Sequence, residues 1–242
     1  MVIYGRNVIR EAIRARLHIK RAYVLDSSNL SREMKQTENE LRHLRVPVEK
    51  MKEEKLKDIT HSKDHQGIAA KINDYKYADT FKTLDHLEHP PFVVILDQVQ
   101  DPHNVGAIIR SAYGAGVDLL ILPKRGGCLV TPAVLKTSAG YAFRLAISVE
   151  TNLARVIEEL KKRGIWVYAA TMKGKPYYDI NMTGPIAFIF GNEGKGVRRL
   201  VMEKSDGLVS IPMAKKMDSL NVSVSVAVIL FRAMEMRNNV NS

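Results

Sequence analysis

From about residue 92 onward, short apolar segments alternate with longer segments in which apolar residues recur every three or four positions. The apolar segments are FVVILD, VDLLILP, RLAISV, IWVYAAT, IAFIFG and LVSIPM. Segments of helical period lie between them, for example TPAVLKTSAGYAF, with Thr131 as its expected N-cap, and NLARVIEELKKRG, which should end at Gly164. Strands that are apolar on both faces are typical of sheets covered by helices on both sides. The alternation therefore predicts an α/β fold with a mostly parallel sheet over residues 91–242.

The first 75 residues show a separate, shorter alternation. Strand-like VIYG, IKRAYVLD and QGIAAKI are interspersed with the helical segments NVIREAIRARL and SREMKQTENELRHL. This pattern predicts a small α/β domain over residues 1–75. Residues 76–90 have little periodicity and are followed by a second proline at Pro91, so we expect a linker there with about one helical turn.

The net charge of the chain indicates a kind of binding partner. The chain holds 37 Lys and Arg against 26 Asp and Glu, a net charge of +11, and residues 1–72 alone hold 16 against 10. Such a surplus favours a polyanion such as RNA over an anionic membrane surface, although many of these charges could serve only to solvate helix faces. No stretch approaches membrane-spanning length, the first residues lack the apolar core of a signal peptide, and Cys128 has no internal partner. These features predict a cytoplasmic protein with no membrane association.

Common signatures of nucleotide, metal and covalent chemistry are missing. No G-x-G-x-x-G follows a strand, and GNEGKG at residues 191–196 lacks the spacing of a phosphate-binding loop. His61 and His65 could share a helix face, but no strong third ligand lies nearby, so we expect no metal. No Cys-His or G-x-S-x-G arrangement indicates a nucleophile.

The stretch DPHNVGAIIRSAYGAG follows the first of these strands and carries one arginine, Arg110. With Asn104 as the expected N-cap, helical geometry turns Ile108 toward the sheet and places Arg110 on the opposite side, among small residues such as Gly106 and Gly114. An ordinary exposed helix face carries Lys, Glu or Gln instead. The pattern indicates that another molecule approaches Arg110, and a solvated arginine is the alternative.

Two further loops after strands are unusual. GNEGKGV at residues 191–197 has three glycines, which permit close backbone approach, though a plain turn before a helix explains it equally well. After LVSIPM, the Ser-Val alternation near residue 222 fits a strand, whereas the length of AVILFRAMEMRN and a cap at Ser219 favour a helix. Ligands of parallel sheets bind beyond the carboxyl ends of strands, where these loops lie.

Taken together and in this order, three stretches resemble the three motifs of the SpoU/TrmH family of RNA ribose 2′-O-methyltransferases, in the SPOUT superfamily. They are LDQVQDPHNVGAIIRSAYGAGV, IFGNEGKGV and IPMAKKMDSLNVSVSVAVILF, and the likeness spans about residues 92–237. The beginning of the chain, from IYGRNVIREAI to HQGIAAKI, is similar to the family's small substrate-binding domain, which is related to ribosomal protein L30e. The layout is most similar to bacterial enzymes that methylate a guanosine of 23S ribosomal RNA.

This resemblance implies a deep trefoil knot over about residues 186–225, S-adenosylmethionine as the methyl donor, and a homodimer with its active site near the subunit interface. By motif, the donor would be contacted by Gly191, Ile211 and Leu220, with Thr171 and Met213 as weaker candidates. The catalytic cluster would comprise Asn104, Arg110, Glu193, Ser219 and Asn221. No metal is implied.

The chemistry leaves alternatives open. Arg110 is the family's proposed base, but a guanidinium keeps its proton in proteins, so it is better suited to clamp a phosphate or to stabilise a developing alkoxide. Glu193 or a phosphate oxygen could then take the hydroxyl proton. Ribosomal RNA is the expected substrate, with tRNA as the second choice because tRNA-specific relatives often lack the small domain. A non-catalytic RNA-binding protein with the same fold is the alternative of a different class.

Overall fold

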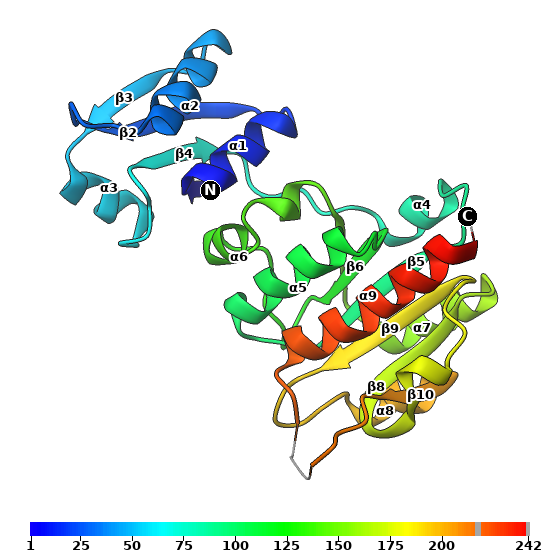
Figure 1. Cartoon of the computed structure of the whole chain (residues 1–242). Helices are drawn as coiled ribbons and strands as arrows, with labels where there is room; N and C mark the ends of the chain where they lie inside the picture. Colours follow the sequence, from blue (N-terminus) through cyan, green and yellow to red (C-terminus); the bar gives the residue numbers. More distant parts are fainter. Residues whose placement is uncertain (216–218, 241–242) are drawn as a thin grey trace. The chain divides into compact units, whose positions relative to one another are not determined.

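The computed structural model describes residues 1–215 and 219–240, and the chain forms two compact units. Unit 1 comprises Met1–Lys76 together with Val130–Arg144, and unit 2 comprises Tyr77–Leu129 together with Leu145–Ser242 (Figure 1). The chain therefore passes from unit 1 to unit 2, returns to unit 1 for 15 residues, and finishes in unit 2.

Unit 1 has a four-stranded sheet in the order β1-β4-β2-β3, in which β2 and β3 are parallel and the other pairs are antiparallel. Its strands are β1 (Val2–Tyr4), β2 (Ile19–Leu25), β3 (Val48–Met51) and β4 (Ile68–Ile72). Its helices are α1 (Arg6–Arg14), α2 (Arg32–His43), α3 (Glu53–Thr60), α6 (Pro132–Thr137) and the 3-10 turn η1 (Tyr141–Phe143). The sequence pattern did not predict β3 or α3. The strand β3 has no buried residue, and α3 buries only Leu56 and Thr60, so neither has a clear apolar period.

The segment that returns to unit 1 is closely packed there. Gly140, at φ +86°, lies against α1 so tightly that a Cβ atom would come within 2.7 Å of the Cβ of Glu11. The hydroxyl of Tyr75 donates to the carbonyl oxygen of Ala142 at 2.6 Å, and the Tyr75 ring stacks on Phe143. These contacts make residues 130–144 an integral part of the unit.

Unit 2 has a six-stranded sheet in the order β10-β8-β9-β5-β6-β7, and all of its described strand pairs are parallel. The strands are β5 (Phe92–Asp97), β6 (Leu119–Pro123), β7 (Ala146–Glu150), β8 (Trp166–Pro176), β9 (Ile186–Gly191) and β10 (Gly207–Ser210). The helices are α4 (Thr80–Asp85), α5 (Pro102–Gly114), α7 (Leu153–Lys162), α8 (Arg199–Lys204), α9 (Val222–Val240) and the 3-10 turn η2 (Tyr177–Asp179). The predicted α/β fold with a mostly parallel sheet is confirmed.

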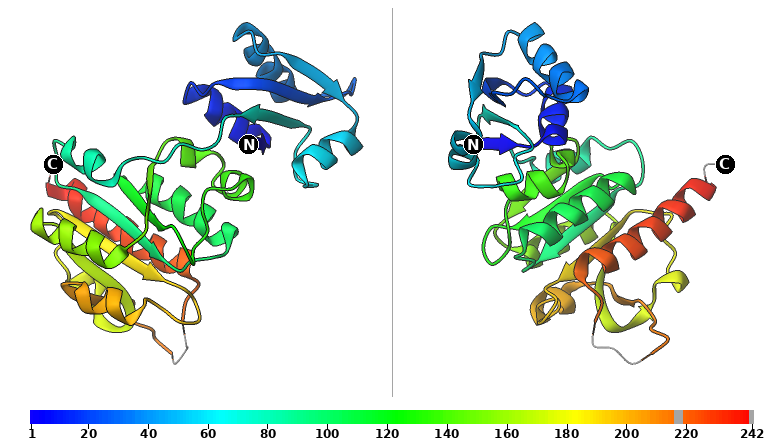
Figure 2. Two further views of the ribbon diagram at one scale, coloured as in Figure 1. Left: turned by 180° about the vertical axis from the view of Figure 1, so that it is seen from behind. Right: turned by 60° about the vertical axis from the view of Figure 1, so that its left-hand side comes forward.

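Helices cover both faces of this sheet. Val93 and Ile95 of β5 belong to a buried cluster that includes residues of α4, α7 and α8. Because side chains alternate along a strand, Val94 and Leu96 point to the other face, where α5 and α9 lie side by side (Figures 1 and 2). The central strands β5 and β6 are buried at every position, which explains their continuous apolar sequence.

Candidate active site

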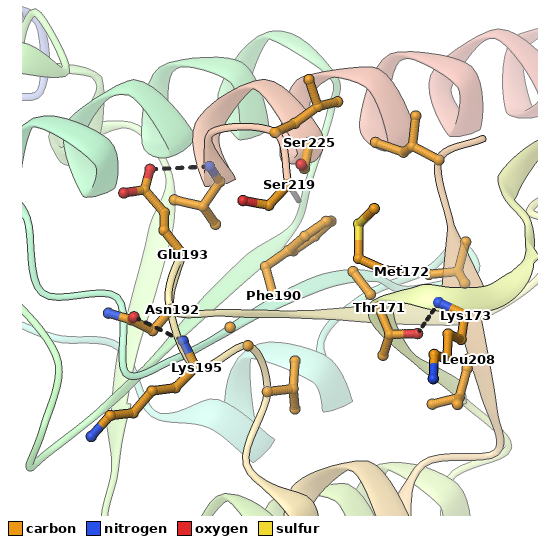
Figure 3. A pocket seen from close by; sticks show the side chains of 18 of the residues that line it. Thr171, Met172, Lys173, Phe190, Asn192, Glu193, Lys195, Leu208, Ser219 and Ser225 are labelled. Carbon is orange, nitrogen blue, oxygen red and sulfur yellow. Dashed lines mark hydrogen bonds between the residues drawn. The ribbon is translucent and has the colours of Figure 1, made fainter. Parts of the chain in front are cut away.

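A cavity of about 510 Å³ lies in unit 2, bounded by β8, the loop after β9, the segment after β10 and the start of α9 (Figure 3). All five residues that the motifs associate with the methyl donor line it, namely Thr171, Gly191, Ile211, Met213 and Leu220. Apolar side chains such as Phe190, Met202 and Leu208 form much of the remaining wall. An apolar cavity of this volume with a few polar groups is typical of a small-molecule site. Residues 216–218 of the third motif lie outside the described residues.

The loop after β9 folds back closely on itself. Asn192 and Gly196 exchange backbone hydrogen bonds of 3.2 and 2.7 Å, and the side-chain oxygen of Asn192 accepts from the N–H of Gly194 at 2.9 Å. At Gly191 a Cβ atom would come within 2.1 Å of the carbonyl carbon of Gly196, so this position accepts only glycine unless the loop moves. The loop therefore presents bare backbone to the cavity at Gly191 and projects Glu193 toward the start of α9 (Figure 3).

Three polar residues from three segments form one hydrogen-bonded cluster at this cavity. Glu193 Oε1 accepts from Asn104 Nδ2 at 3.2 Å, from Asn221 Nδ2 at 2.5 Å and from the N–H of Val222 at 3.4 Å. Asn221 Nδ2 also donates to Asn104 Oδ1 at 3.0 Å. Converging N–H donors at the N-terminus of α9 stabilise the negative charge of this carboxylate. Asn104, Glu193 and Asn221 were expected to act together, and the structure brings them into contact.

The cap expected at Thr131 is confirmed for α6. The caps expected at Asn104 and Ser219 were wrong, and the correction explains the cluster. Asp101, not Asn104, caps α5, because its carboxylate accepts from the N–H of His103 at 2.9 Å. Asn104 lies in the first turn, nearly buried, and its amide is free to reach Glu193. Likewise Asn221, not Ser219, caps α9, because its Oδ1 accepts from the N–H groups of residues 223 and 224. With Oδ1 committed to the helix, its Nδ2 must point toward acceptors, which are Asn104 and Glu193.

The remaining two candidates lie apart from this cluster. Ser219 lines the cavity (Figure 3). Arg110 is exposed on α5, does not line the cavity, and makes no hydrogen bond or ion pair with any residue that the structure describes. One turn further along α5, Gly114 faces Phe231 of α9, since a Cβ atom there would be 3.6 Å from the Phe231 ring. Within one chain, Arg110 is therefore on the α9 side of α5 rather than at the cavity.

Asp97 and Arg198 are features of this region that the motif reading missed. Asp97 ends β5 fully buried, and its carboxylate is bound by the backbone and the guanidinium of Arg198, just beyond the glycine-rich loop. An acidic residue at the end of the otherwise apolar FVVILD was the available signal, because buried carboxylates are almost always paired.

Other chemistries find little support in the described parts of the chain. Burial raises the pKa of the Cys128 thiol, and nearby Asp101 raises it further, so this thiol stays protonated at neutral pH and is a poor nucleophile. The helix α3 ends at Thr60 and His61 adopts a left-handed conformation, so His61 and His65 do not share a helix face. Across residues 1–215 and 219–240, no group of three His, Cys, Asp or Glu side chains could hold a metal, and no helix has the length and apolar character needed to cross a bilayer.

Comparison with known proteins identifies the family. The sequence profile described as the SpoU rRNA Methylase family matches residues 91–231, and the profile for RNA 2′-O ribose methyltransferase substrate binding matches residues 2–78. The chain belongs to the SpoU rRNA methylase family. The resemblance inferred from the three motifs is thereby confirmed.

Curated relatives cover between three quarters and nearly the whole of the chain. The 23S rRNA (guanosine-2′-O-)-methyltransferase RlmB of Xanthomonas campestris pv. campestris is 34% identical over 239 residues, which are 97% of this chain and 96% of that protein. The enzyme of the same name from Ralstonia nicotianae is 41% identical over 187 residues, 76% of this chain and 75% of that protein. The SpoU methyltransferase AviRb from Streptomyces viridochromogenes, solved in complex with AdoMet, superposes with a TM-score of 0.83 over 99% of this chain and 91% of that one. At 22% identity, this structure shows a shared fold.

Proposed function

We propose that this chain transfers a methyl group from S-adenosylmethionine to the ribose 2′-hydroxyl of a guanosine in 23S ribosomal RNA. One observation carries the proposal: all five expected donor-binding residues line the same cavity as Glu193, which is hydrogen-bonded to Asn104 and Asn221. The names of the Xanthomonas and Ralstonia relatives support the substrate and the reaction. The net charge of +11 supports an RNA partner, and an rRNA substrate supports a cytoplasmic location.

The cavity residues suit the methyl donor. Gly191 provides an open stretch of backbone, and Ile211 and Leu220 provide apolar contact on either side of residues 216–218. Thr171 and Met213 complete the lining toward β8 and β10. S-adenosylmethionine, when bound, supplies a methyl group that its sulfonium activates for transfer. The protein's part is to orient that donor and to exclude water, which an apolar wall favours.

We also propose the deep trefoil knot over residues 186–225. In its support, β10 adds to the outer edge of the sheet beside β8, whereas the chain that follows returns to the centre and begins α9 beside β9 and α5. The donor cavity lies among the segments that make this return.

A homodimer would complete the active site. Arg110 is exposed on the side of α5 that faces α9, and α9 exposes Val224 and Phe231 there, 47% and 44% accessible and seven residues apart on one helix face. Exposed apolar side chains on the same side as an exposed guanidinium are typical of a surface that another protein covers. We propose that a second copy covers it and that Arg110 of each subunit serves the cavity of the other.

Roles for the polar groups follow from their bonding. We assign Arg110 to clamp the phosphate beside the target ribose and to stabilise the developing alkoxide, because a guanidinium offers several N–H donors in a planar fork. Glu193 is held through Oε1 by Asn104, Asn221 and Val222, which leaves Oε2 to accept the hydroxyl proton. Asn104 and Asn221 orient that carboxylate.

Two experiments test the proposal. Mass-spectrometric mapping of ribose methylation in total RNA, from cells with and without the protein, should show one guanosine of 23S rRNA losing its methyl group. Loss at a tRNA nucleotide would transfer the assignment to tRNA. If there is no change in any RNA and no binding of S-adenosylmethionine at millimolar concentration in calorimetry, the chain is an RNA-binding protein instead.

Mixed dimers test the shared site. Arg110→Ala and Glu193→Gln should each inactivate the homodimer. A mixed dimer of the two variants has one site with wild-type Glu193 and wild-type Arg110 if each site takes these residues from different subunits. Unfolding and refolding an equal mixture should therefore restore about a quarter of wild-type activity, because half of the dimers are mixed and each has one intact site of two. Activity no higher than that of the separate variants would contradict the shared site and leave the reaction itself untouched.

A further inference from the structure

Asp97 and Arg198 form an ion pair, which we call the clamp, beside the proposed active site. Asp97 Oδ2 accepts from the backbone N–H of Arg198 at 2.8 Å, and Oδ1 accepts from its Nε at 2.8 Å and its Nη2 at 2.7 Å. The Asp97 side chain is fully buried, whereas that of Arg198 is 46% accessible. Both carboxylate oxygens are thus used by a single residue, which fixes its backbone and its side chain together.

The same aspartate also holds the other end of the glycine-rich loop. In the parallel ladder of β5 and β9, Asp97 is the register partner of Gly191, the last residue of β9. The loop that starts at Gly191 and ends at Arg198 is therefore closed on Asp97 at both ends. Next to it in sequence, Gln98 adopts φ 63°, and its carbonyl oxygen accepts from Asn192 Nδ2 at 3.2 Å, which adds a third attachment.

The loop carries the groups that the proposed reaction uses. Glu193 reaches Asn104 and Asn221 from inside it, and Gly191 forms part of the cavity wall. Glycines at three of its positions make the loop intrinsically permissive, so its conformation has to be imposed by contacts at its ends. We propose that Asp97 and Arg198 are positioning residues for methyl transfer, an assignment that rests on the function proposed above: they close the loop so that Glu193 meets its two amide partners.

The energetics of ion pairs favour this role over a purely stabilising one. Burial of a carboxylate carries a desolvation penalty that can exceed the attraction to its partner, so well-packed apolar residues often stabilise a fold equally well. An apolar pair, however, would not fix the orientation of the loop end. The planar fork of Arg198, with its own N–H on the second oxygen, allows one orientation of the loop end.

The test compares two neighbouring arginines. Arg198→Lys keeps the charge and the backbone N–H but loses the fork. Arg199→Lys is the matched control because Arg199 is 90% exposed and, among the residues that the structure describes, pairs only with Glu203 one turn away. Asp97→Asn, with Glu203→Gln as its control, tests the other partner. We expect the single-turnover rate at saturating donor and RNA to fall at least tenfold for Arg198→Lys and Asp97→Asn, and to stay within twofold for both controls. Asp97→Asn is compared only if circular dichroism shows that it is folded at the assay temperature. If it is not folded, the milder variant Arg198→Lys alone tests the proposal.

Two readouts distinguish positioning from general structural damage. In a Glu193→Gln background, Arg198→Lys should cause almost no further loss of rate, because a residue that acts through Glu193 has nothing left to position. In addition, the side-chain amide resonances of Asn104 and Asn221 in ¹⁵N NMR spectra of the donor-free protein should shift in Arg198→Lys and not in Arg199→Lys. Fully additive rate losses, or amide resonances that do not move in Arg198→Lys, would each overturn the proposal. The NMR comparison needs no RNA, so it decides about the clamp even if the wild-type protein methylates nothing.

Discussion

Asn221 Nδ2 lies 2.5 Å from Glu193 Oε1 while the Oδ1 of the same side chain caps α9 by accepting from the N–H of Ser223 at 3.0 Å. The side-chain amide of Asn221 therefore both caps the start of α9 and fixes the position of the Glu193 carboxylate in the loop after β9. Asn104 at the start of α5 completes the triangle. The three sequence motifs are thus coupled through a single hydrogen-bonded cluster. This coupling can be tested by separating the two functions of Asn221, which are capping α9 and binding Glu193.

The substitution Asn221→Asp should separate capping from carboxylate binding. Aspartate caps helices as well as asparagine does, so we expect the melting temperature to change little. It cannot donate to Glu193, however, and places a second negative charge beside it, so the single-turnover methylation rate should fall by about 10²-fold or more. A tritium-transfer assay and differential scanning fluorimetry measure the two effects.

Asn221→Ala is the companion variant, because it removes both functions. It should lose activity as Asn221→Asp does and should also lose about 0.5–2 kcal/mol of folding stability with the cap. If Asn221→Asp instead retained near wild-type rates, the contact between Asn221 and Glu193 would have no part in the reaction.

Gly191 and Gly194 offer a matched pair of glycines in one loop. A Cβ atom at Gly191 would lie 2.1 Å from the carbonyl carbon of Gly196, whereas at Gly194 the nearest atom, Asn192 Oδ1, is 3.5 Å away. Gly191→Ala should therefore push the cavity wall outward and weaken S-adenosylmethionine binding at least tenfold in calorimetry. Gly194→Ala should bind within about threefold of wild type. Equal affinities for the two variants would show that the Gly191 backbone does not form part of the donor site.

The sequence predicted the central strands well because burial on both faces leaves a continuous apolar signal. The bounds of β5 and β9 match FVVILD and IAFIFG residue for residue. It failed where burial is partial. The half-exposed β3 alternates too weakly to be recognised, and the helix at α5 was started at Asn104 although Asp101-Pro102 was the better signal, since proline favours the first helical position.

In the candidate site, too, some features could be predicted from the sequence and others could not. Its loops could be located because parallel strands place their carboxyl ends at one edge of a sheet, which the motif order reflects. The pairing of Asp97 with Arg198 could not be predicted. The acidic end of FVVILD indicates that Asp97 has a partner, but the partner lies 101 residues away and nothing local identifies it. The position of Arg110 outside its own cavity is a second example, since helical periodicity gives a face but not the neighbour of that face.

Arg237 should contribute to stability through three carbonyl groups. From α9, its guanidinium donates to the carbonyl oxygens of Gly184 at 2.8 Å, of Met182 at 3.2 Å and of Pro90, and it lies 5.1 Å from the centre of the Phe92 ring. A lysine cannot reach three acceptors with a planar fork. We expect Arg237→Lys to lower the free energy of unfolding in urea by about 1–3 kcal/mol.

A control for this prediction is Arg155→Lys, at an exposed position of α7 where no side-chain partner is described. It should leave the unfolding midpoint within experimental error of wild type. A change in Arg237→Lys no larger than that in the control would mean that the carbonyl contacts of Arg237 are replaced by water without cost.

His65 should make unit 1 sensitive to mild acid. The residue is buried, 4% exposed, and its Nδ1 accepts from the N–H of Gly67 at 3.0 Å, a bond that protonation would break. Burial is the largest cause that lowers its pKa from 6.5, with the positive charges of Lys57 and Lys136 acting in the same direction, while Glu53 and Asp64 oppose them. Since the unfolded chain then binds the proton more tightly than the folded one, stability is highest above pH 6.5 and falls as the pH drops below that value. In His65→Asn the side-chain oxygen can still accept from Gly67 but has no such titration, so its melting temperature should fall less than that of wild type between pH 7 and pH 5. Parallel slopes for the two proteins over this range would assign the acid sensitivity of the unit to other groups.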